Sequence, residues 1–265
     1  MRQQTFKVLL ITLISFGFYY LFQNLYFKTF YNYLCDVINI KVIAYFLTYI
    51  IVGLPLLIGL FFTQRPKDIF NCLGIVNGFF KGLLFAFLFT LPMLIGYSIF
   101  LKFNSDITCN KILAGAVLAA FFEELYFRGI LFGQLFRFTK IGFIPSVLLC
   151  ALVFALVHLW QSTAPLTIFG IFMTTFLGAV FFAWLYIEWD SNLWIPIGMH
   201  LFMNLHWILF SAGDNALGGT YANIFRVITI AITIVGTLYY KKRTGKKLGV
   251  NRNNLWINKT SSNNA

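Results

Sequence analysis

The chain has 265 residues, of which 60% are hydrophobic and only 11% are charged. A soluble globular protein carries roughly 25% charged residues, so this composition excludes a soluble enzyme and a disordered chain. Near-continuous apolar runs such as residues 42–62 also exclude a membrane β-barrel, because barrel strands alternate apolar and polar residues over about ten positions. The composition therefore predicts an all-α polytopic membrane protein.

The formal net charge is +12. In a soluble protein such an excess would suggest nucleic acid as a partner. Here the basic residues flank the apolar runs, which indicates a role in setting topology and in contacting lipid headgroups. We therefore expect membrane lipids, and no nucleic acid, as partners. The four cysteines occur singly, without a CxxC pair or a metal-ligand spacing.

Eight apolar runs have about the twenty residues that a helix needs to cross a bilayer. In chain order they are residues 8–27, 42–62, 82–101, 112–136, 141–160, 165–187, 193–211 and 221–240. The first run shows no small-residue cleavage site, so we interpret it as an uncleaved span. Nothing outside the runs is large enough for a soluble domain. The sequence predicts one membrane domain over residues 1–265, built as a bundle of about eight transmembrane helices.

The distribution of Lys and Arg among the short loops predicts the orientation, because cytoplasmic loops carry an excess of these residues. With a cytoplasmic N-terminus, fourteen of the 20 Lys and Arg residues fall on the cytoplasmic side. The four on the other side are Lys28, Lys41, Lys102 and Lys111. Both termini are therefore predicted to be cytoplasmic, with residues 241–265 as a basic tail. The abundance of Phe, Ile, Asn and Lys is typical of an AT-rich bacterial gene and suggests a bacterial plasma membrane.

A few ionisable side chains interrupt the apolar runs. A charge at the bilayer centre costs at least ~2.5–3.5 kcal/mol, so such groups face the interior of the bundle and often mark a functional site. They are Glu123, Glu124, Arg128, His158, His200, His206 and Arg226. All three histidines lie in two of the runs, 141–160 and 193–211.

The two adjacent glutamates differ in their predicted surroundings. Helical spacing of about 100° per residue puts Arg128 only ~40° from Glu124 and one turn further on, which suits an ion pair. Glu123 points about 100° away and stays available for proton transfer. The alternative is that both carboxylates serve a structural pair or a helix end at the membrane interface.

His200 and Asn204 are four residues apart and share one helix face. Two convergent hydrogen-bond donors suit a developing oxyanion, although an interhelical hydrogen bond is the simpler alternative. His158 ends its run, and such a histidine taken alone is more often a capping or interface residue than a catalyst. His206 lies about 240° around the helix from His200 and is expected to face elsewhere.

The three motifs gain specificity from their order in the chain. Glu-Glu-x-x-x-Arg at 123–128 is followed by Phe-x-x-x-His at 154–158 and His-x-x-x-Asn at 200–204. This order resembles the CAAX-protease and bacteriocin-processing family (CPBP, also called Abi) of intramembrane endopeptidases, over roughly residues 110–210. The eight-helix count agrees with what the family implies.

The resemblance implies a role for each motif residue. Glu123 would be the general base that activates water, with His158 assisting it. His200 and Asn204 would stabilise the tetrahedral oxyanion. The supporting residues would be Glu124, Arg128 and Phe154, with Arg128 holding Glu124.

Metal dependence is open at this point. Glu123, His158 and His200 could gather around zinc, whereas the amide of Asn204 is a poor ligand. The chain contains no His-Glu-x-x-His helix, and the signatures of serine and aspartyl intramembrane proteases are missing as well. We favour a metal-free glutamate mechanism without a cofactor over a zinc-dependent one.

The resemblance implies a membrane-associated peptide or protein as substrate. It is either a prenylated C-terminal CaaX peptide or, in bacteria, a leader or bacteriocin peptide. Because bacteria generally lack prenylated CaaX proteins, peptide processing or bacteriocin self-immunity is favoured, by analogy.

Two other functions remain in view. One is a non-catalytic immunity or scaffold membrane protein of the same fold. The other is a small transporter or channel, a class that usually shows discontinuous helices or internal repeats. The only candidate for a helix break is Gly53-Leu54-Pro55, which a simple proline kink would also explain.

Overall fold

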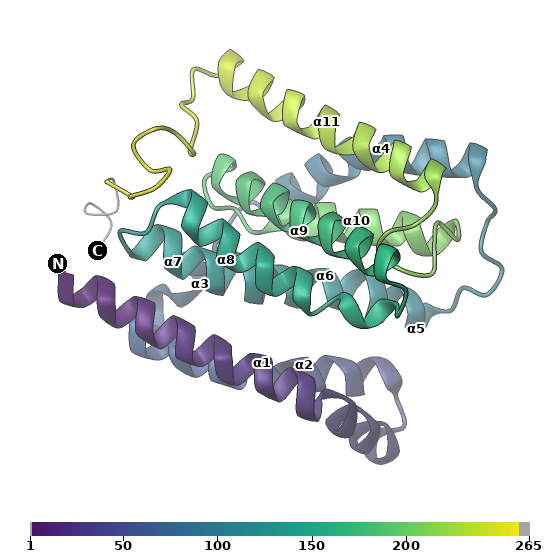
Figure 1. Cartoon of the computed structure of the whole chain (residues 1–265), viewed down its shortest axis with the longest axis horizontal. Helices are drawn as coiled ribbons and strands as arrows, with labels where there is room; N and C mark the ends of the chain where they lie inside the picture. Colours follow the sequence, from purple (N-terminus) through teal and green to yellow (C-terminus); the bar gives the residue numbers. More distant parts are fainter. Residues whose placement is uncertain (1, 260–265) are drawn as a thin grey trace.

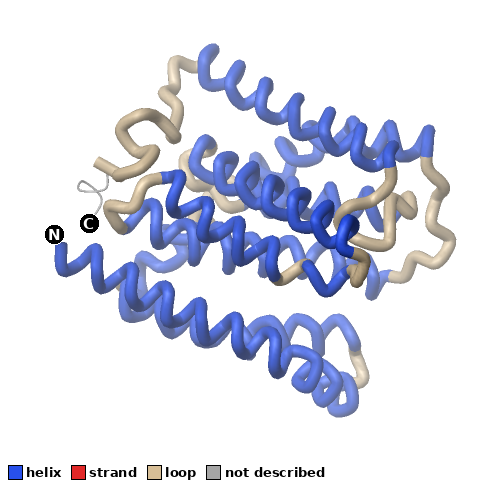
Figure 2. Tube along the Cα trace, in the orientation of Figure 1, coloured by secondary structure: helices blue, strands red, loops and turns tan. Residues whose placement is uncertain are grey.

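The computed structural model describes residues 2–259 of the chain. Within this range the regular structure is helical and forms no strand, as Figure 2 shows. A single β-bridge joins Ile141 to Ile257. A helix satisfies its backbone polar groups within its own segment, which a spanning segment in lipid requires. The prediction of an all-α protein is confirmed.

Each predicted apolar run falls mainly on a helical segment, and the run at 141–160 continues past its helix through a turn into a 3-10 turn. The long helices are α1 (Arg2–Ile38), α2 (Lys41–Thr63), α4 (Phe79–Phe100), α8 (Phe143–Leu156), α9 (Pro165–Glu188), α10 (Trp194–Leu209) and α11 (Thr220–Arg243). The run at 112–136 lies in a continuous helical segment, 109–138, which we call the motif helix. It consists of α5 (Cys109–Ile112), a π-helix (Leu113–Leu118), α6 (Ala119–Glu123), a second π-helix (Glu124–Phe132) and α7 (Gly133–Phe138). Shorter pieces are α3 (Ile69–Leu73) and the 3-10 turns Pro66–Asp68 and Leu159–Gln161.

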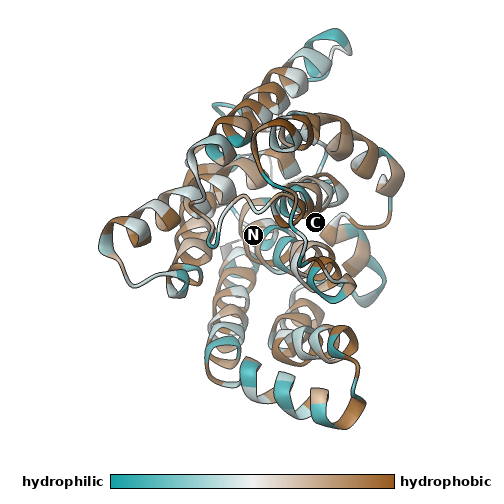
Figure 3. Cartoon of the chain, turned by 90° about the vertical axis from the view of Figure 1, so that its right-hand side faces the viewer, coloured by the Kyte–Doolittle hydropathy of each residue, from teal (hydrophilic) through white to brown (hydrophobic). Residues whose placement is uncertain are grey.

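Six helices of the described chain are long and apolar enough to cross a membrane. The motif helix and α10 are not among them, because the first carries several charges and the second has only 16 residues. The count of about eight spans therefore stays a prediction. Between 22% and 39% of the most apolar window of each span is buried inside the protein. Most residues of each window are therefore not buried in the protein, which suits contact with lipid. Figure 3 shows hydrophobic residues along the helices.

The helices form three groups across the bundle (Figure 1). The pair α1 and α2 pack along each other on one side, and α4 packs against α10 and α11 on the other. The motif helix, α8 and α9 lie between them. The start of α1 and the chain that follows α11 lie at the same end of the bundle, which we call the terminal end (Figure 1). Which end faces the cytoplasm stays a prediction.

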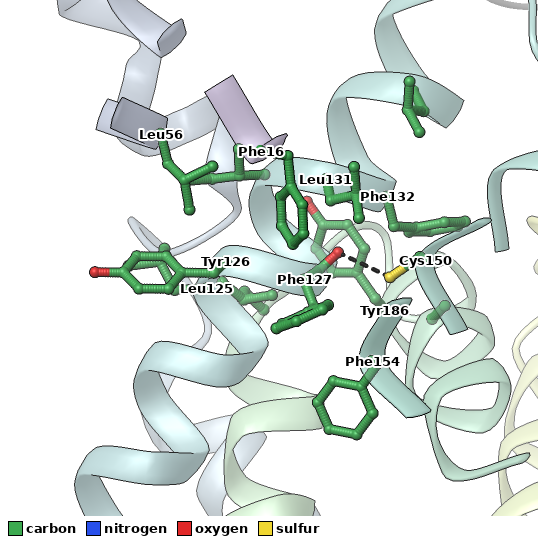
Figure 4. Packing of buried hydrophobic residues seen from close by; sticks show 14 of the residues in the cluster. Phe16, Leu56, Leu125, Tyr126, Phe127, Leu131, Phe132, Cys150, Phe154 and Tyr186 are labelled. Atoms are coloured by element: carbon green, nitrogen blue, oxygen red, sulfur yellow. Dashed lines mark hydrogen bonds between the residues drawn. The ribbon is translucent and has the colours of Figure 1, made fainter. Parts of the chain in front are cut away.

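The motif helix forms the centre of the hydrophobic core (Figure 4). The ring of Phe127 packs edge-on against the rings of Phe154 and Phe16, with centroids 4.9 and 5.2 Å away. The Cys150 thiol on α8 donates a hydrogen bond of 3.2 Å to the Phe127 carbonyl. These contacts hold the motif helix between α1 and α8.

Helix α2 runs unbroken through Pro55, so the break considered at residues 53–55 is not formed. The glycine there has a packing role instead. A Cβ on Gly53 would lie 2.1 Å from the Tyr126 hydroxyl, which donates a 2.8 Å hydrogen bond to the Tyr49 carbonyl. Only glycine allows this close approach of α2 to the motif helix.

The chain beyond α11 folds back onto the bundle. The Glu188 carboxylate at the end of α9 lies 2.8 Å from the Lys241 ammonium, and both side chains are buried. The same carboxylate accepts hydrogen bonds of 3.0 Å from the backbone N–H groups of Gly249 and Val250. The predicted basic tail therefore begins inside α11 and is docked as far as it is described; residues 260–265 lie outside the described residues.

Candidate active site

The structure brings the four predicted catalytic side chains to one cavity. Glu123, His158, His200 and Asn204 all line a space of about 430 Å³, which we call the motif cavity. This volume lies within the roughly 300–1,000 Å³ that is usual for ligand pockets. The residues come from the motif helix, the turn after α8 and the middle of α10.

The position of Glu123 is set by a change in helix type. It is the last residue of α6, and Glu124 opens the π-helix that runs to Phe132. A π-helix has i→i+5 hydrogen bonds, is rare, and occurs frequently at functional sites. At this junction Glu123 reaches the motif cavity with a side chain that is 21% exposed, while Glu124 is fully buried.

The ion pair predicted from helical spacing is present. Arg128 Nη1 lies 3.0 Å from Glu124 Oε1, and both side chains are completely buried. The Arg128 guanidinium carbon also lies 4.4 Å from the centre of the Phe154 ring and 5.4 Å from that of Phe182. These rings stabilise the cation through its attraction to their π-faces. Phe154, the predicted supporting residue, therefore acts on Arg128.

Glu124 has a second partner that spacing along the chain did not reveal. His200 Nδ1 lies 2.7 Å from Glu124 Oε1, across 76 positions of sequence. Because a carboxylate only accepts hydrogen bonds, Nδ1 carries the proton. The other ring nitrogen, Nε2, lies 3.9 Å from Glu123 Oε2, which is too far for a hydrogen bond, and it can act as a donor only when the ring holds both protons. Glu124 thus orients His200 as well as pairing with Arg128.

His158 and Asn204 are each held by one backbone carbonyl. His158 Nδ1 lies 2.7 Å from the Phe154 carbonyl, so Nδ1 is the donor and Nε2 of the neutral ring keeps its lone pair. Asn204 Nδ2 donates a 3.0 Å hydrogen bond to the Gly115 carbonyl, in the first π-helix of the motif helix. The second Nδ2 proton of Asn204 stays available for another acceptor.

A second cavity, of about 560 Å³, shares Glu123, Phe154, His158 and Gln161 with the first. We call it the polar cavity because many of its other lining residues carry hydrogen-bonding groups. These residues are Tyr19, Gln23, Asn24, Lys28, Tyr45 and Tyr49. Gln23 Oε1 is buried without a hydrogen-bond partner. Glu123 and His158 thus lie where the two cavities meet.

The described residues contain no group of three or more His, Cys, Asp and Glu side chains placed to hold a metal ion. The zinc alternative would use Glu123, His158 and His200. In the structure Nδ1 of His200 is already bonded to Glu124. A histidine whose Nδ1–H is held by a carboxylate can still bind zinc through Nε2, so this contact favours neither mechanism over the other.

Two other intramembrane ionisable groups have different surroundings. His206 is buried and lines neither of the two cavities, in agreement with its predicted position around α10. Arg226 on α11 lines the motif cavity, although the sequence marked it only as a charge within an apolar run.

A comparison with known protein families found one family model that matches the region of the three motifs. The model of a family described as Type II CAAX prenyl endopeptidase Rce1-like matches residues 105–206, which include all three motifs. This part of the chain is therefore similar to the Rce1-like family. The resemblance to the CAAX-protease family is confirmed, and with it a membrane protein of an endopeptidase kind. Neither the curated proteins nor the solved structures gave a match.

Proposed function

We propose that the protein is an intramembrane endopeptidase in which Glu123 activates water to hydrolyse a peptide bond. One observation carries the proposal: Glu123, His158, His200 and Asn204 line a single cavity, and Glu123 is the carboxylate that is not paired with Arg128. A general base must come within hydrogen-bond reach of the proton that it takes, and Glu123 lines the cavity in which the substrate would bind.

The reaction follows from these groups. Glu123 takes a proton from water while the water oxygen attacks the carbonyl carbon, and the carbonyl π-electrons move to its oxygen. Asn204 Nδ2, and His200 Nε2 when the ring is doubly protonated, donate hydrogen bonds to this oxyanion. The oxyanion then collapses, the C–N bond breaks, and Glu123 returns the proton to the leaving amine. Donors held in place before the reaction are among the largest catalytic contributions.

The polar cavity supports this assignment by supplying water. It reaches Glu123 and His158, and the hydroxyl and amide groups along it can hydrogen-bond to water. His158 Nε2 accepts a hydrogen bond from the nucleophilic water and helps to orient it. The apolar part of the motif cavity holds the peptide.

Cleavage of peptides by the purified protein tests the proposal. We expect wild type to cut members of a fluorogenic peptide library, offered with and without prenyl groups. Asn204→Ala should lower kcat by about 10²–10³-fold, because it removes an oxyanion donor. We also expect His158→Ala and His200→Ala to be impaired. A zinc chelator should leave the wild-type rate unchanged.

Two results would contradict parts of this proposal. Loss of activity with the chelator and its recovery with zinc would replace the metal-free mechanism by a zinc-dependent one. If wild type cleaves nothing while Glu123→Ala retains the cellular phenotype, the protein is a non-catalytic immunity or scaffold protein. Size-exclusion profiles of the variants serve as the control for folding.

The side from which the substrate comes follows from the predicted orientation. The motif cavity includes Gln161, Asn215 and Ala216, from the loops after α8 and α10 at the end opposite the terminal end (Figure 1). If the terminal end is cytoplasmic, this end of the cavity faces outwards. We therefore propose that the substrate is an exported peptide or leader, presented from the non-cytoplasmic side.

Sealed membrane vesicles test this orientation. A membrane-impermeant peptide substrate should be cleaved by right-side-out vesicles, and by inverted vesicles only after detergent opens them. Cleavage by intact inverted vesicles would reverse the assignment and favour a cytosolic CaaX-type substrate.

A further inference from the structure

Arg226 is a half-buried cation without a counter-charge. Among the described residues, no carboxylate lies within 4.0 Å of its guanidinium, and its Nη1 atom is buried without a hydrogen-bond partner. Its guanidinium carbon lies 4.4 Å from the centre of the Trp207 ring. The stacked ring holds the guanidinium in place and leaves its other N–H groups without a carboxylate partner.

A charge within an apolar helix is costly and is usually paired or functional. The buried Glu124–Arg128 and Glu188–Lys241 pairs of this protein show the paired case. Arg226 differs from both because it opens onto the motif cavity, which also holds Glu123 and Asn204. An arginine fork that is fixed and unpaired matches the two oxygens of a carboxylate.

We propose that Arg226 binds the C-terminal carboxylate of the substrate peptide and thereby selects substrates that end inside the motif cavity. This inference rests on the proposed endopeptidase function. The peptide bond at Glu123 and the carboxylate at Arg226 would then lie in one space of about 430 Å³, which has room for only a few residues. Arg226 therefore fixes the cleavage position by measuring from the free end of the chain.

A lipid phosphate could also pair with an arginine. The location favours the peptide, because Arg226 lines the same cavity as the proposed general base. Binding of a lipid phosphate to Arg226 is therefore treated as one outcome of the test.

Peptide binding to the full-length protein with Glu123→Gln tests the inference without cleavage. The probe is a set of fluorescently labelled dodecapeptides with four randomised C-terminal positions, made as free acids and as C-terminal amides. We expect the acids to bind about 10- to 100-fold more tightly, equivalent to about 1.4–2.8 kcal/mol. Arg226→Gln should remove this difference, and Arg226→Lys should restore part of it. Lys102→Gln removes a positive charge from outside the cavity and should keep it.

Several results would overturn the inference. They are equal binding of acids and amides, no binding of either, and a preference for acids that survives Arg226→Gln. Native mass spectrometry tests for a lipid instead. If Arg226→Gln loses bound phosphatidylglycerol while the ratio of acid to amide binding stays the same, Arg226 binds a lipid phosphate. If Arg226→Gln does not fold, the binding of acids and amides to the protein that keeps Arg226 still tests the inference, because equal binding would contradict it.

Cleavage by the protein with Glu123 intact separates the two proposals. If it cuts acids faster than amides, and Arg226→Gln equalises the rates, both proposals stand. If nothing is cleaved but acids still bind more tightly through Arg226, the endopeptidase proposal fails and the carboxylate site stands.

Discussion

Replacing Glu123 with glutamine is expected to lower kcat for peptide cleavage by about 10²–10⁴-fold, the usual contribution of a general base. The amide keeps the shape of the side chain but cannot take a proton from water. The change should be seen in kcat with little change in KM, because Glu123 acts on the water and not on peptide binding. Initial rates with the best peptide from the library, measured for purified wild type and variant, give both values.

The same substitution should not impair folding. Glu123 is partly exposed, and its nearest charged contact among the described residues is the imidazole of His200 at 3.9 Å. We therefore expect a thermal midpoint equal to that of wild type, or slightly higher, since catalytic residues are often not optimal for stability. Glu123→Asp is the matched control, because it keeps the carboxylate but withdraws it by one methylene. Glu123→Gln with more than a tenth of wild-type activity would contradict the assignment of the base.

Local spacing predicted part of this site correctly. The Glu124–Arg128 pair was visible because its members are one helical turn apart, and they do form the pair. The separation of His206 from the site followed from the same angular argument. Such predictions work because both members lie on one helix, whose geometry is known in advance.

Contacts between helices could not be predicted in this way. The hydrogen bond between Glu124 and His200 joins α10 to the motif helix, and the return of the chain to Glu188 joins α9 to residues beyond α11. These contacts depend on how the helices pack, which one sequence without an alignment does not specify. The π-helical turns also have no signal in the apolar pattern, because hydrophobic periodicity does not separate them from an α-helix.

Breaking the buried Glu124–Arg128 pair should have the largest effect on stability. Glu124→Gln keeps the volume of the side chain but leaves the Arg128 cation buried and uncompensated, which typically costs about 3–5 kcal/mol. The remaining attraction to the Phe154 and Phe182 rings offsets only part of this cost, since cation–π contacts contribute up to about 2 kcal/mol when desolvated. Unfolding in mixed micelles with increasing denaturing detergent measures the change.

The double variant Glu124→Leu/Arg128→Met tests whether the ion pair stabilises the fold or serves the active site. Replacing a buried ion pair by apolar side chains of similar volume is often neutral or stabilising, so we expect this variant to regain most of the stability lost in Glu124→Gln. A double variant as unstable as the single one would show that the pair itself stabilises the bundle.

Activity should not return with stability. In the double variant His200 Nδ1 has no carboxylate partner, so neither the orientation of the ring nor the proton on Nδ1 is fixed. We expect a stable protein whose kcat stays at least about tenfold below wild type, measured on the same peptide. This combination would mean that the chain keeps a costly buried charge pair because Glu124 must be ionised to position His200. Full activity in the double variant would remove Glu124 from the catalytic arrangement and leave it a purely structural role.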